Sequence, residues 1–174
     1  MTMTQPKGPE SVPERYIRSI QQADNTGMAR VIREVMTEFG AVGAGFSIED
    51  PEVDNMYEAY SGEGQCFNVL VGGSEILGGA GVAPLQEGPP GICELRKMYV
   101  LPQARGNGVG RDLLQLCVEQ ARALGFEGCY LETLDGMQGA RHLYKSFGFE
   151  DLSGPLGATG HGGCDRWMML SLLV

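Results

Sequence analysis

The feature that most constrains this chain is a run of glycines at residues 106–110, which lies between a strand pattern and a helix pattern. Residues 94–100 carry apolar side chains typical of a strand, and the run stops at Pro102, which has no N–H to offer a sheet. Apolar residues then recur at helical spacing, which predicts an amphipathic helix over about 111–124. This order of strand, glycine loop and helix predicts a ligand-binding turn.

The glycine loop favours a phosphate ligand. Gly106, Gly108 and Gly110 allow a tight turn and close approach of a ligand, and the first N–H groups of the following helix attract an anion. The loop ends in Arg111, so it lacks the lysine and hydroxyl residue of a Walker A loop. Its G-x-G-x-G spacing also differs from the G-x-G-x-x-G of dinucleotide-binding folds. Both of these common phosphate loops are therefore excluded.

The loop 105–110 resembles the acetyl-CoA loop of the GCN5-related N-acetyltransferase (GNAT) superfamily, whose signature is Gln/Arg-x-x-Gly-x-Gly/Ala. Two further segments are similar to that family. The strand 94–100 precedes the loop, and residues 143–149, Leu-Tyr-Lys-Ser-Phe-Gly-Phe, resemble the family's "LYxxxGF" helix end. Together these features cover about residues 92–150. The resemblance implies acetyl-CoA as the cosubstrate.

The patterns elsewhere predict a single α/β (α+β) domain over residues 16–174, after a flexible tail at 1–15. The resemblance implies the GNAT fold, a mixed and mostly antiparallel central sheet of about seven strands with helices on both faces. Strands are expected at about 16–21, 65–71, 76–83, 94–100, 128–133, 149–152 and 164–172, and helices at about 26–39, 52–60, 111–124 and 137–146.

Composition narrows the function further. A formal charge of -9 argues against general binding to nucleic acid, which needs Lys and Arg to neutralise phosphates. No apolar run is long enough to span a membrane, and the first fifteen residues do not resemble a signal peptide. The five cysteines are odd in number and lie mostly in apolar runs, which favours buried free thiols in a reducing compartment. We expect a soluble cytoplasmic protein.

Acetyl transfer to an amine needs a base for the amine and an acid for the departing thiolate. The resemblance places Glu94 where many family members keep a carboxylate base, with Glu132 on the next strand as the alternative. A carboxylate with an ordinary pKa near 4.3 would act through water or need its pKa raised by burial. The resemblance also places the Tyr144 hydroxyl beside the cofactor sulphur, as the acid or as a positioning group.

The resemblance implies that the central strand and the strand after the loop helix separate, which leaves a cleft for the pantetheine arm. The backbone of Met98, Tyr99 and Val100 would bind that arm. Backbone N–H groups of the loop would bind the phosphates, and the Arg105 and Arg111 side chains either join them or are solvated. The loop residues concerned are Arg105, Gly106, Asn107, Gly108, Val109, Gly110 and Arg111.

Two segments depart from the pattern or add to it. Many members have Asn where this chain has Met137, so that cofactor contact is in doubt, and Gln138 is a possible replacement. The segment 161–167 contains a His-x-x-Cys pair, but a zinc site needs three or four ligands, so we expect no metal. Its single tryptophan is expected to anchor the last strand. The acceptor pocket is a further possible place for His161, Asp165 or Trp167.

The resulting hypothesis is an acetyl-CoA-dependent N-acetyltransferase that works by direct transfer in a ternary complex. The acceptor is expected to be a primary amine of a small metabolite, such as an amino acid. A polyamine, an aminoglycoside and a protein N-terminus or lysine stay open. The alternative class is a non-catalytic acyl-CoA sensor. Many relatives pair through sheet edges, so a homodimer is also expected.

Overall fold

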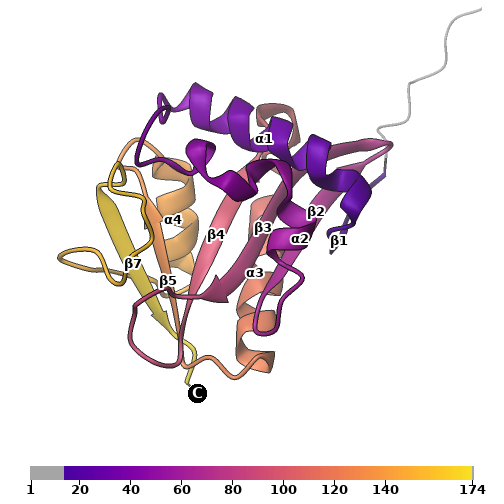
Figure 1. Ribbon diagram of the computed structural model, residues 1–174. Coiled ribbons are helices and arrows are strands. Elements are labelled where there is room, and N and C mark those ends of the chain that lie inside the picture. The colour runs from indigo at the N-terminus through magenta and orange to yellow at the C-terminus, as the bar shows by residue number, and fades with distance from the viewer. Residues whose placement is uncertain (1–13, 174) are drawn as a thin grey trace, which may run out of the picture.

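The computed structural model describes residues 14–173, which form one seven-stranded sheet with the order β1-β2-β3-β4-β5-β7-β6 (Figure 1). Every neighbouring pair is antiparallel except β4 and β5, which are parallel. The predicted mixed, mostly antiparallel sheet is therefore confirmed. The strands are β1 (Arg15–Ser19), β2 (Cys66–Gly72), β3 (Glu75–Pro84), β4 (Ile92–Val100), β5 (Gly128–Thr133), β6 (Glu150–Asp151) and β7 (Arg166–Ser171).

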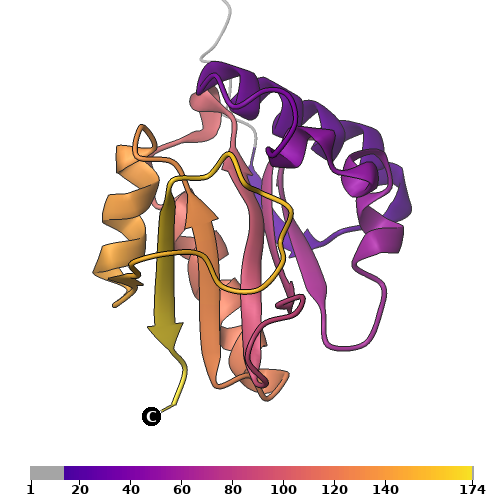
Figure 2. The ribbon, with the colours of Figure 1, turned by 60° about the vertical axis from the view of Figure 1, so that its left-hand side comes forward.

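Helices cover both faces of this sheet (Figures 1 and 2). One face is covered by α1 (Asn25–Glu38) and the short α2 (Met56–Ala59), and the other by α3 (Val109–Ala123) and α4 (Gln138–Ser146). Four short 3-10 helices complete the elements: η1 (Gln22–Asp24), η2 (Ser47–Glu49), η3 (Pro51–Asp54) and η4 (Pro102–Ala104).

The core follows from the apolar stripes of the two long helices. In α1, Met28, Val31 and Ile32 are fully buried against the sheet, and in α3 the stripe includes the fully buried Leu113 and Leu114. Each such side chain contributes about 1.5–3 kcal/mol through burial. The middle of the sheet is thus covered by α1 on one face and α3 on the other, and both helices pack against β4.

Several predicted boundaries are wrong, among them the start of the last strand, which is Arg166 and not Cys164. The single helix expected over 52–60 is broken, because Asn55 leaves helical geometry (φ -137, ψ 45) between η3 and α2. The first strand ends at Ser19, earlier than expected. Arg15, assigned to the tail, belongs to β1, where it pairs with Gly72. The rest of the predicted tail, residues 1–13, lies outside the described residues.

All five cysteines are free thiols, and Cys93, Cys117 and Cys129 are buried. Within residues 14–173, none of the helices has the length and apolar character that crossing a membrane requires.

Candidate active site

The site begins where β4 and β5 part. They pair only from Ile92 to Glu94 on β4, against Gly128 to Tyr130 on β5. Beyond that point β4 borders a cleft of about 520 Å³, which is also lined by the start of α3 and by α4 with the residues before it. The early end of the β4–β5 pairing agrees with the separation that the family resemblance implied. The lining of the cleft includes seven of the ten predicted cofactor residues, namely Met98, Tyr99, Val100, Arg105, Gly106, Val109 and Gly110.

The glycine loop adopts a conformation that only glycine-rich sequences take readily. Gly106, Asn107 and Gly108 all have positive φ, at 80°, 52° and 82°. The turn leads directly into α3, and within the described chain no backbone acceptor is found for the N–H groups of Gly110 and Arg111. These donors and the helix dipole favour an anion at this end of the cleft. The loop therefore fits the phosphates of a cofactor.

The two loop arginines are already engaged by the protein. Arg105 forms two bonds to the Glu38 carboxylate, at 2.7 and 2.6 Å, and its Nε donates to the Val100 carbonyl at 2.8 Å. The Arg111 guanidinium lies over the Phe147 ring, 5.1 Å from its centroid. These contacts brace the loop, and phosphate binding by the two side chains stays a prediction.

A second, smaller cavity of about 50 Å³ continues from the cleft toward the acceptor side. Met98, Tyr99, Met137 and Tyr144 line both spaces. Tyr144 is buried, burial raises the pKa of its phenol above the usual value, and its hydroxyl has no hydrogen bond to another described residue. Its proton therefore stays on the oxygen at neutral pH, next to both cavities. We name the smaller space the reaction cavity.

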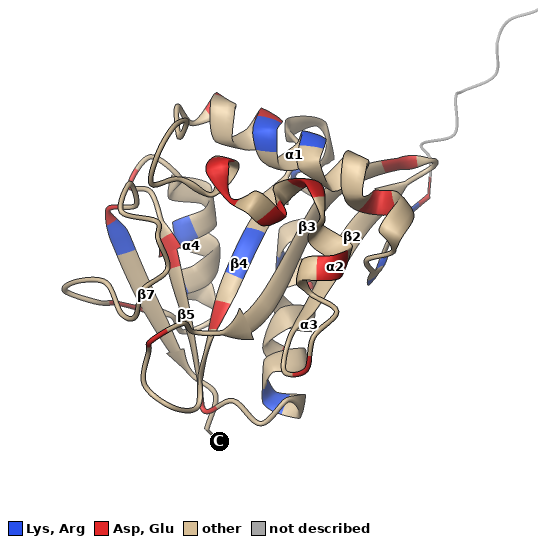
Figure 3. Cartoon of the chain, viewed as in Figure 1, with Lys and Arg blue, Asp and Glu red and all other residues tan. Residues whose placement is uncertain are grey.

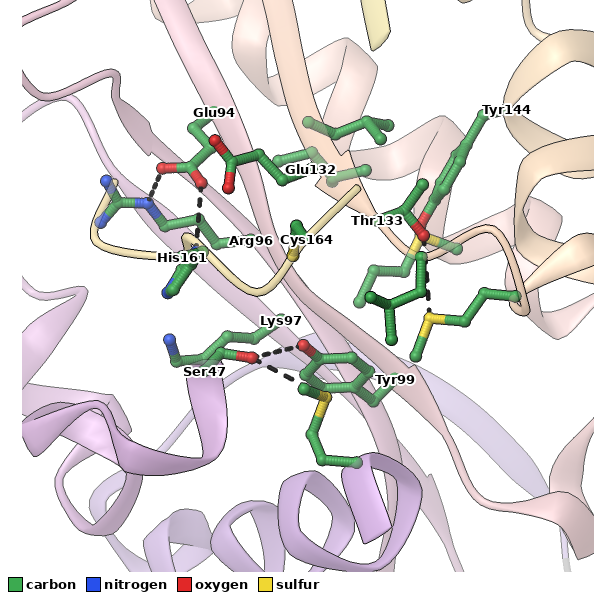
Figure 4. Close-up of a pocket in the computed structure, with 16 residues that line it drawn as sticks. Ser47, Glu94, Arg96, Lys97, Tyr99, Glu132, Thr133, Tyr144, His161 and Cys164 are labelled. Atoms are coloured by element: carbon green, nitrogen blue, oxygen red, sulfur yellow. Dashed lines mark hydrogen bonds and ion pairs between the residues drawn. The ribbon is translucent and has the colours of Figure 1, made fainter. Parts of the chain in front are cut away.

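Glu94 lines the reaction cavity from β4 and is only 2% exposed. Its Oε2 accepts a hydrogen bond from Arg96 Nε at 2.6 Å, and its Oε1 lies 4.0 Å from His161 Nδ1 (Figure 4). Burial raises the pKa of Glu94 above its usual value, although Arg96 opposes the shift. A carboxyl with a raised pKa is better matched to accepting a proton from an amine near neutral pH.

A bulge in β4 directs an additional charge toward the site. Between the paired positions Gly79–Tyr99 and Gly81–Arg96, β3 has one residue and β4 has two, and Lys97 has a positive φ of 50°. The buried Lys97 ammonium pairs with the carboxylates of Asp50 and Glu52, the latter at 3.0 Å. In Figure 3 the blue segment of β4 lies near red segments of the connection between α1 and α2, which carries Asp50 and Glu52.

His161 joins two segments that are far apart in sequence. Its Nε2 lies 2.9 Å from Asp50 Oδ2, and its Nδ1 faces Glu94. Burial alone would lower the pKa of His161, but the hydrogen bond and charge of Asp50 outweigh it and raise the pKa above the usual value. The contact between His161 and Asp50 connects the loop before β7 with the segment that follows α1, beside the reaction cavity. His161 therefore lines the reaction cavity. The sequence had indicated the acceptor pocket as a possible place for this residue.

A third cavity, of about 350 Å³, adjoins the reaction cavity on the side away from the cofactor cleft. Glu132, His161 and Cys164 line both spaces, and Trp167 lines the third cavity. We name this space the acceptor vestibule. Asp165 lines neither cavity; its carboxylate accepts a hydrogen bond from the Asp135 N–H at 2.8 Å.

Sequence reasoning missed Asp50, Arg96, Lys97 and the Ser47 hydroxyl, which is 2.6 Å from the Tyr99 hydroxyl. One signal was present: residues 94, 96 and 97 place three charged side chains in an otherwise apolar strand. Such a strand is costly to bury unless the charges are paired or functional. Among residues 14–173, no group of three or more His, Cys, Asp and Glu side chains is placed to hold a metal ion.

Residues 28–149 match the model of the acetyltransferase (GNAT) family. An uncharacterised N-acetyltransferase of Escherichia coli, YjgM, is 41% identical over 157 residues, covering 90% of this chain and 94% of the relative. An uncharacterised N-acetyltransferase of Schizosaccharomyces pombe is 32% identical over 146 residues, covering 82% of this chain and 85% of the relative.

Solved structures agree with the fold. A GNAT acetyltransferase from Staphylococcus aureus superimposes with a TM-score of 0.81 at 19% identity, over 92% of this chain and 100% of that one. The acetyltransferase yncA of Salmonella typhimurium, solved with acetyl-CoA, gives a TM-score of 0.71 at 21% identity, over 92% and 95% of the two chains. Enzymes of this family use acetyl-CoA as the acetyl donor. The chain therefore belongs to the acetyltransferase (GNAT) family and is an N-acetyltransferase.

Proposed function

We propose that this protein transfers the acetyl group of acetyl-CoA directly to a primary amine of a small metabolite, such as an amino acid or a related amine. One observation carries the proposal: Glu94 and Tyr144 line the same reaction cavity, and Tyr144 also lines the cofactor cleft. A base and an acid are thus available at the point where the two substrates would meet. The bound cosubstrate supplies the activated acetyl group.

Glu94 is proposed as the base. Its carboxylate takes a proton from the acceptor ammonium, either directly or through one water molecule. The nitrogen lone pair that this step frees then attacks the acetyl carbonyl carbon. Arg96 holds one carboxylate oxygen at 2.6 Å, so the other oxygen, which faces the cavity beside His161, is the one proposed to receive the proton.

Tyr144 is proposed as the acid. Its raised pKa keeps the phenol protonated, and a thiolate that leaves next to it takes that proton. The buried position supports this role, because an acid that is shielded from water delivers its proton to the leaving group and not to solvent. The cofactor itself is proposed to lie along Met98 and Tyr99, with its phosphates at the loop 105–111.

The test is acetyl-CoA consumption with release of free thiol, measured on purified protein against a panel of primary amines. Thiol release that depends on the amine supports the enzyme and identifies its acceptor class. Tight binding of acetyl-CoA without release for any amine, proteins and peptides included, would favour the sensor alternative. Absence of acetyl-CoA binding would contradict the proposed role of the loop.

A cytoplasmic location and a homodimer are also proposed. The five free thiols support a reducing compartment. The exposed edge of β1, where Tyr16 is 51% exposed, offers a surface for pairing two copies. Cell fractionation and light scattering with the purified protein test the two statements.

A further inference from the structure

Glu132 has a carboxylate oxygen that the protein leaves unused. Its Oε1 accepts a hydrogen bond from the Tyr130 hydroxyl at 2.7 Å, whereas its Oε2 is buried with no hydrogen-bond partner in the described chain. The Tyr130 hydroxyl in turn accepts the Leu156 N–H at 3.1 Å, which fixes both groups. A buried carboxylate oxygen without a donor is costly unless a ligand or water supplies one. Glu132 Oε2 is therefore held in place and can accept a hydrogen bond from a ligand.

The charges around the two acceptor-side cavities leave this carboxylate without a cation. Arg96 forms a salt bridge with Glu94. Lys97 forms salt bridges with Asp50 and Glu52, and these two carboxylates line neither cavity. No described salt bridge includes Glu132, whose charge instead adds to the burial that raises the pKa of Glu94. Counted with Asp50 and Glu52, four carboxylates surround Arg96, Lys97 and His161, and this excess of negative charge suits a ligand with more than one positive group.

The position of Glu132 separates it from the reacting nitrogen. Glu94 lines only the reaction cavity, whereas Glu132 lies at its border with the acceptor vestibule. Across the β5–β7 pair Glu132 stands directly opposite Trp167, the one aromatic residue among those described as lining the vestibule. Directly opposed residues in a sheet have neighbouring side chains on the same face. A carboxylate beside an indole is a favourable place for an ammonium group.

We propose that the acceptor carries a second ammonium group, which binds between Glu132 and Trp167 while the first amine reacts beside Glu94. This inference rests on the proposed function and narrows its acceptor to amines with a second cationic group. Free diamines and basic amino acids share that chemistry. The vestibule supplies no described Lys or Arg for an anionic group at the same place.

Three amines with the same four-carbon chain test the charge directly: 1,4-diaminobutane, n-butylamine and 4-aminobutyrate. Thiol release is measured for each with wild type and with Glu132→Gln. We expect kcat/KM for the diamine to exceed that for n-butylamine by about tenfold, the scale of one charge-assisted hydrogen bond, with 4-aminobutyrate poorest. The variant should lose this preference and keep the KM for acetyl-CoA. Ornithine, which adds a carboxylate to the diamine, tells a basic amino acid from a free diamine.

Glu150→Gln is the matched control, since it removes the same charge at an exposed residue of β6 outside the cavities. Tyr130→Phe keeps the Glu132 carboxylate but removes its positioning bond, so it should weaken the preference partly. Calorimetric titration of 1,4-diaminobutane into wild type and Glu132→Gln, both with CoA present, gives a second readout that needs no turnover. Binding should weaken about tenfold in the variant.

Two results would overturn the inference: wild type with equal kcat/KM for the diamine and the monoamine, or diamine binding that Glu132→Gln leaves unchanged. A failure of the proposed function looks different, because then no amine releases thiol while the calorimetric comparison still decides the role of Glu132.

Discussion

The two halves of the active site are built from different parts of the chain. The proposed cofactor side consists of the 105–111 loop and the part of β4 that does not pair with β5, which are nearly contiguous in sequence and offer mainly backbone groups. The proposed acceptor side is assembled from side chains of distant segments, such as Asp50, Glu94, Glu132 and His161. A backbone site needs a fold and a few glycines, whereas a side-chain site needs particular residues. The first half suits a cosubstrate shared by a family, and the second suits an individual acceptor.

Glu94→Gln is expected to show the largest difference between its effect on the acceptor amine and its effect on acetyl-CoA. Removal of a general base typically lowers the rate by about 10²–10⁴-fold, and we expect kcat/KM for the amine to fall by that factor. Because acetyl-CoA is proposed to bind on the other side, its affinity should not change. Glu150→Gln, exposed on β6, is the control for loss of one carboxylate. Unchanged activity would transfer the role of base to Glu132 or to water.

If Glu94 is the base, kcat/KM should depend on pH in a defined direction. Burial raises the pKa of Glu94, so as pH falls the residue becomes protonated, and kcat/KM should drop, at a pH above the ordinary carboxyl value of about 4.3. A pH profile of wild type should show this acid limb, and the residual activity of Glu94→Gln should lack it. An identical limb in the variant would assign it to another group.

Tyr144→Phe tests the residue that borders both halves. The change removes one hydroxyl and keeps the ring that packs near Phe149, 5.7 Å between centroids. We expect kcat to fall by about 10–100-fold, with the KM for the amine nearly unchanged, since an acid acts on the leaving group and not on the bound amine. A thioester with a more acidic thiol should recover part of the loss. No recovery would indicate that the hydroxyl only positions the cofactor.

A smaller effect is expected from Gly108→Ala in the cofactor side. A Cβ at Gly108 would meet no atom within 4 Å, so the cost arises only from its φ of 82°. That conformation costs a non-glycine residue about 1–2 kcal/mol, which chemical denaturation can measure. Gly136→Ala is the matched control, because a Cβ there also meets no atom within 4 Å but the residue has no positive φ. Equal stability of the two variants would contradict the strain argument.

The smallest effect is expected for His161→Gln. Asp50 raises the pKa of His161 in the folded protein, although burial and Lys97 act to lower it. The stabilisation, about 1 kcal/mol for one hydrogen bond, should be present below the unfolded pKa near 6.5 and disappear as pH rises through the folded value. Thermal unfolding of both proteins from pH 6 to 9 measures it, with the exposed His142→Gln as control. A difference that grows with pH would contradict the sign.

The difference between the two halves also explains which features the sequence alone could predict. Glycines at 106, 108 and 110 and the strand before them predicted the loop, because contiguous residues determine local geometry of this kind. The mixed sheet and the cofactor cleft were implied by the family resemblance that these residues carry. The contact between Asp50 and His161 joins residues 111 positions apart, and no local pattern announces it. The bulge at Lys97 is likewise set by packing in the sheet and not by a turn residue.

The affinity of acetyl-CoA, measured by calorimetry for wild type, Gly108→Ala and Glu94→Gln, tests the division of the site into a cofactor half and an acceptor half. If backbone of the loop binds the cosubstrate and side chains bind the acceptor, the dissociation constant should rise about tenfold in Gly108→Ala, the equivalent of about 1.4 kcal/mol, and stay at the wild-type value in Glu94→Gln. Weaker binding in Glu94→Gln with no change in Gly108→Ala would contradict the division of the site into these two halves.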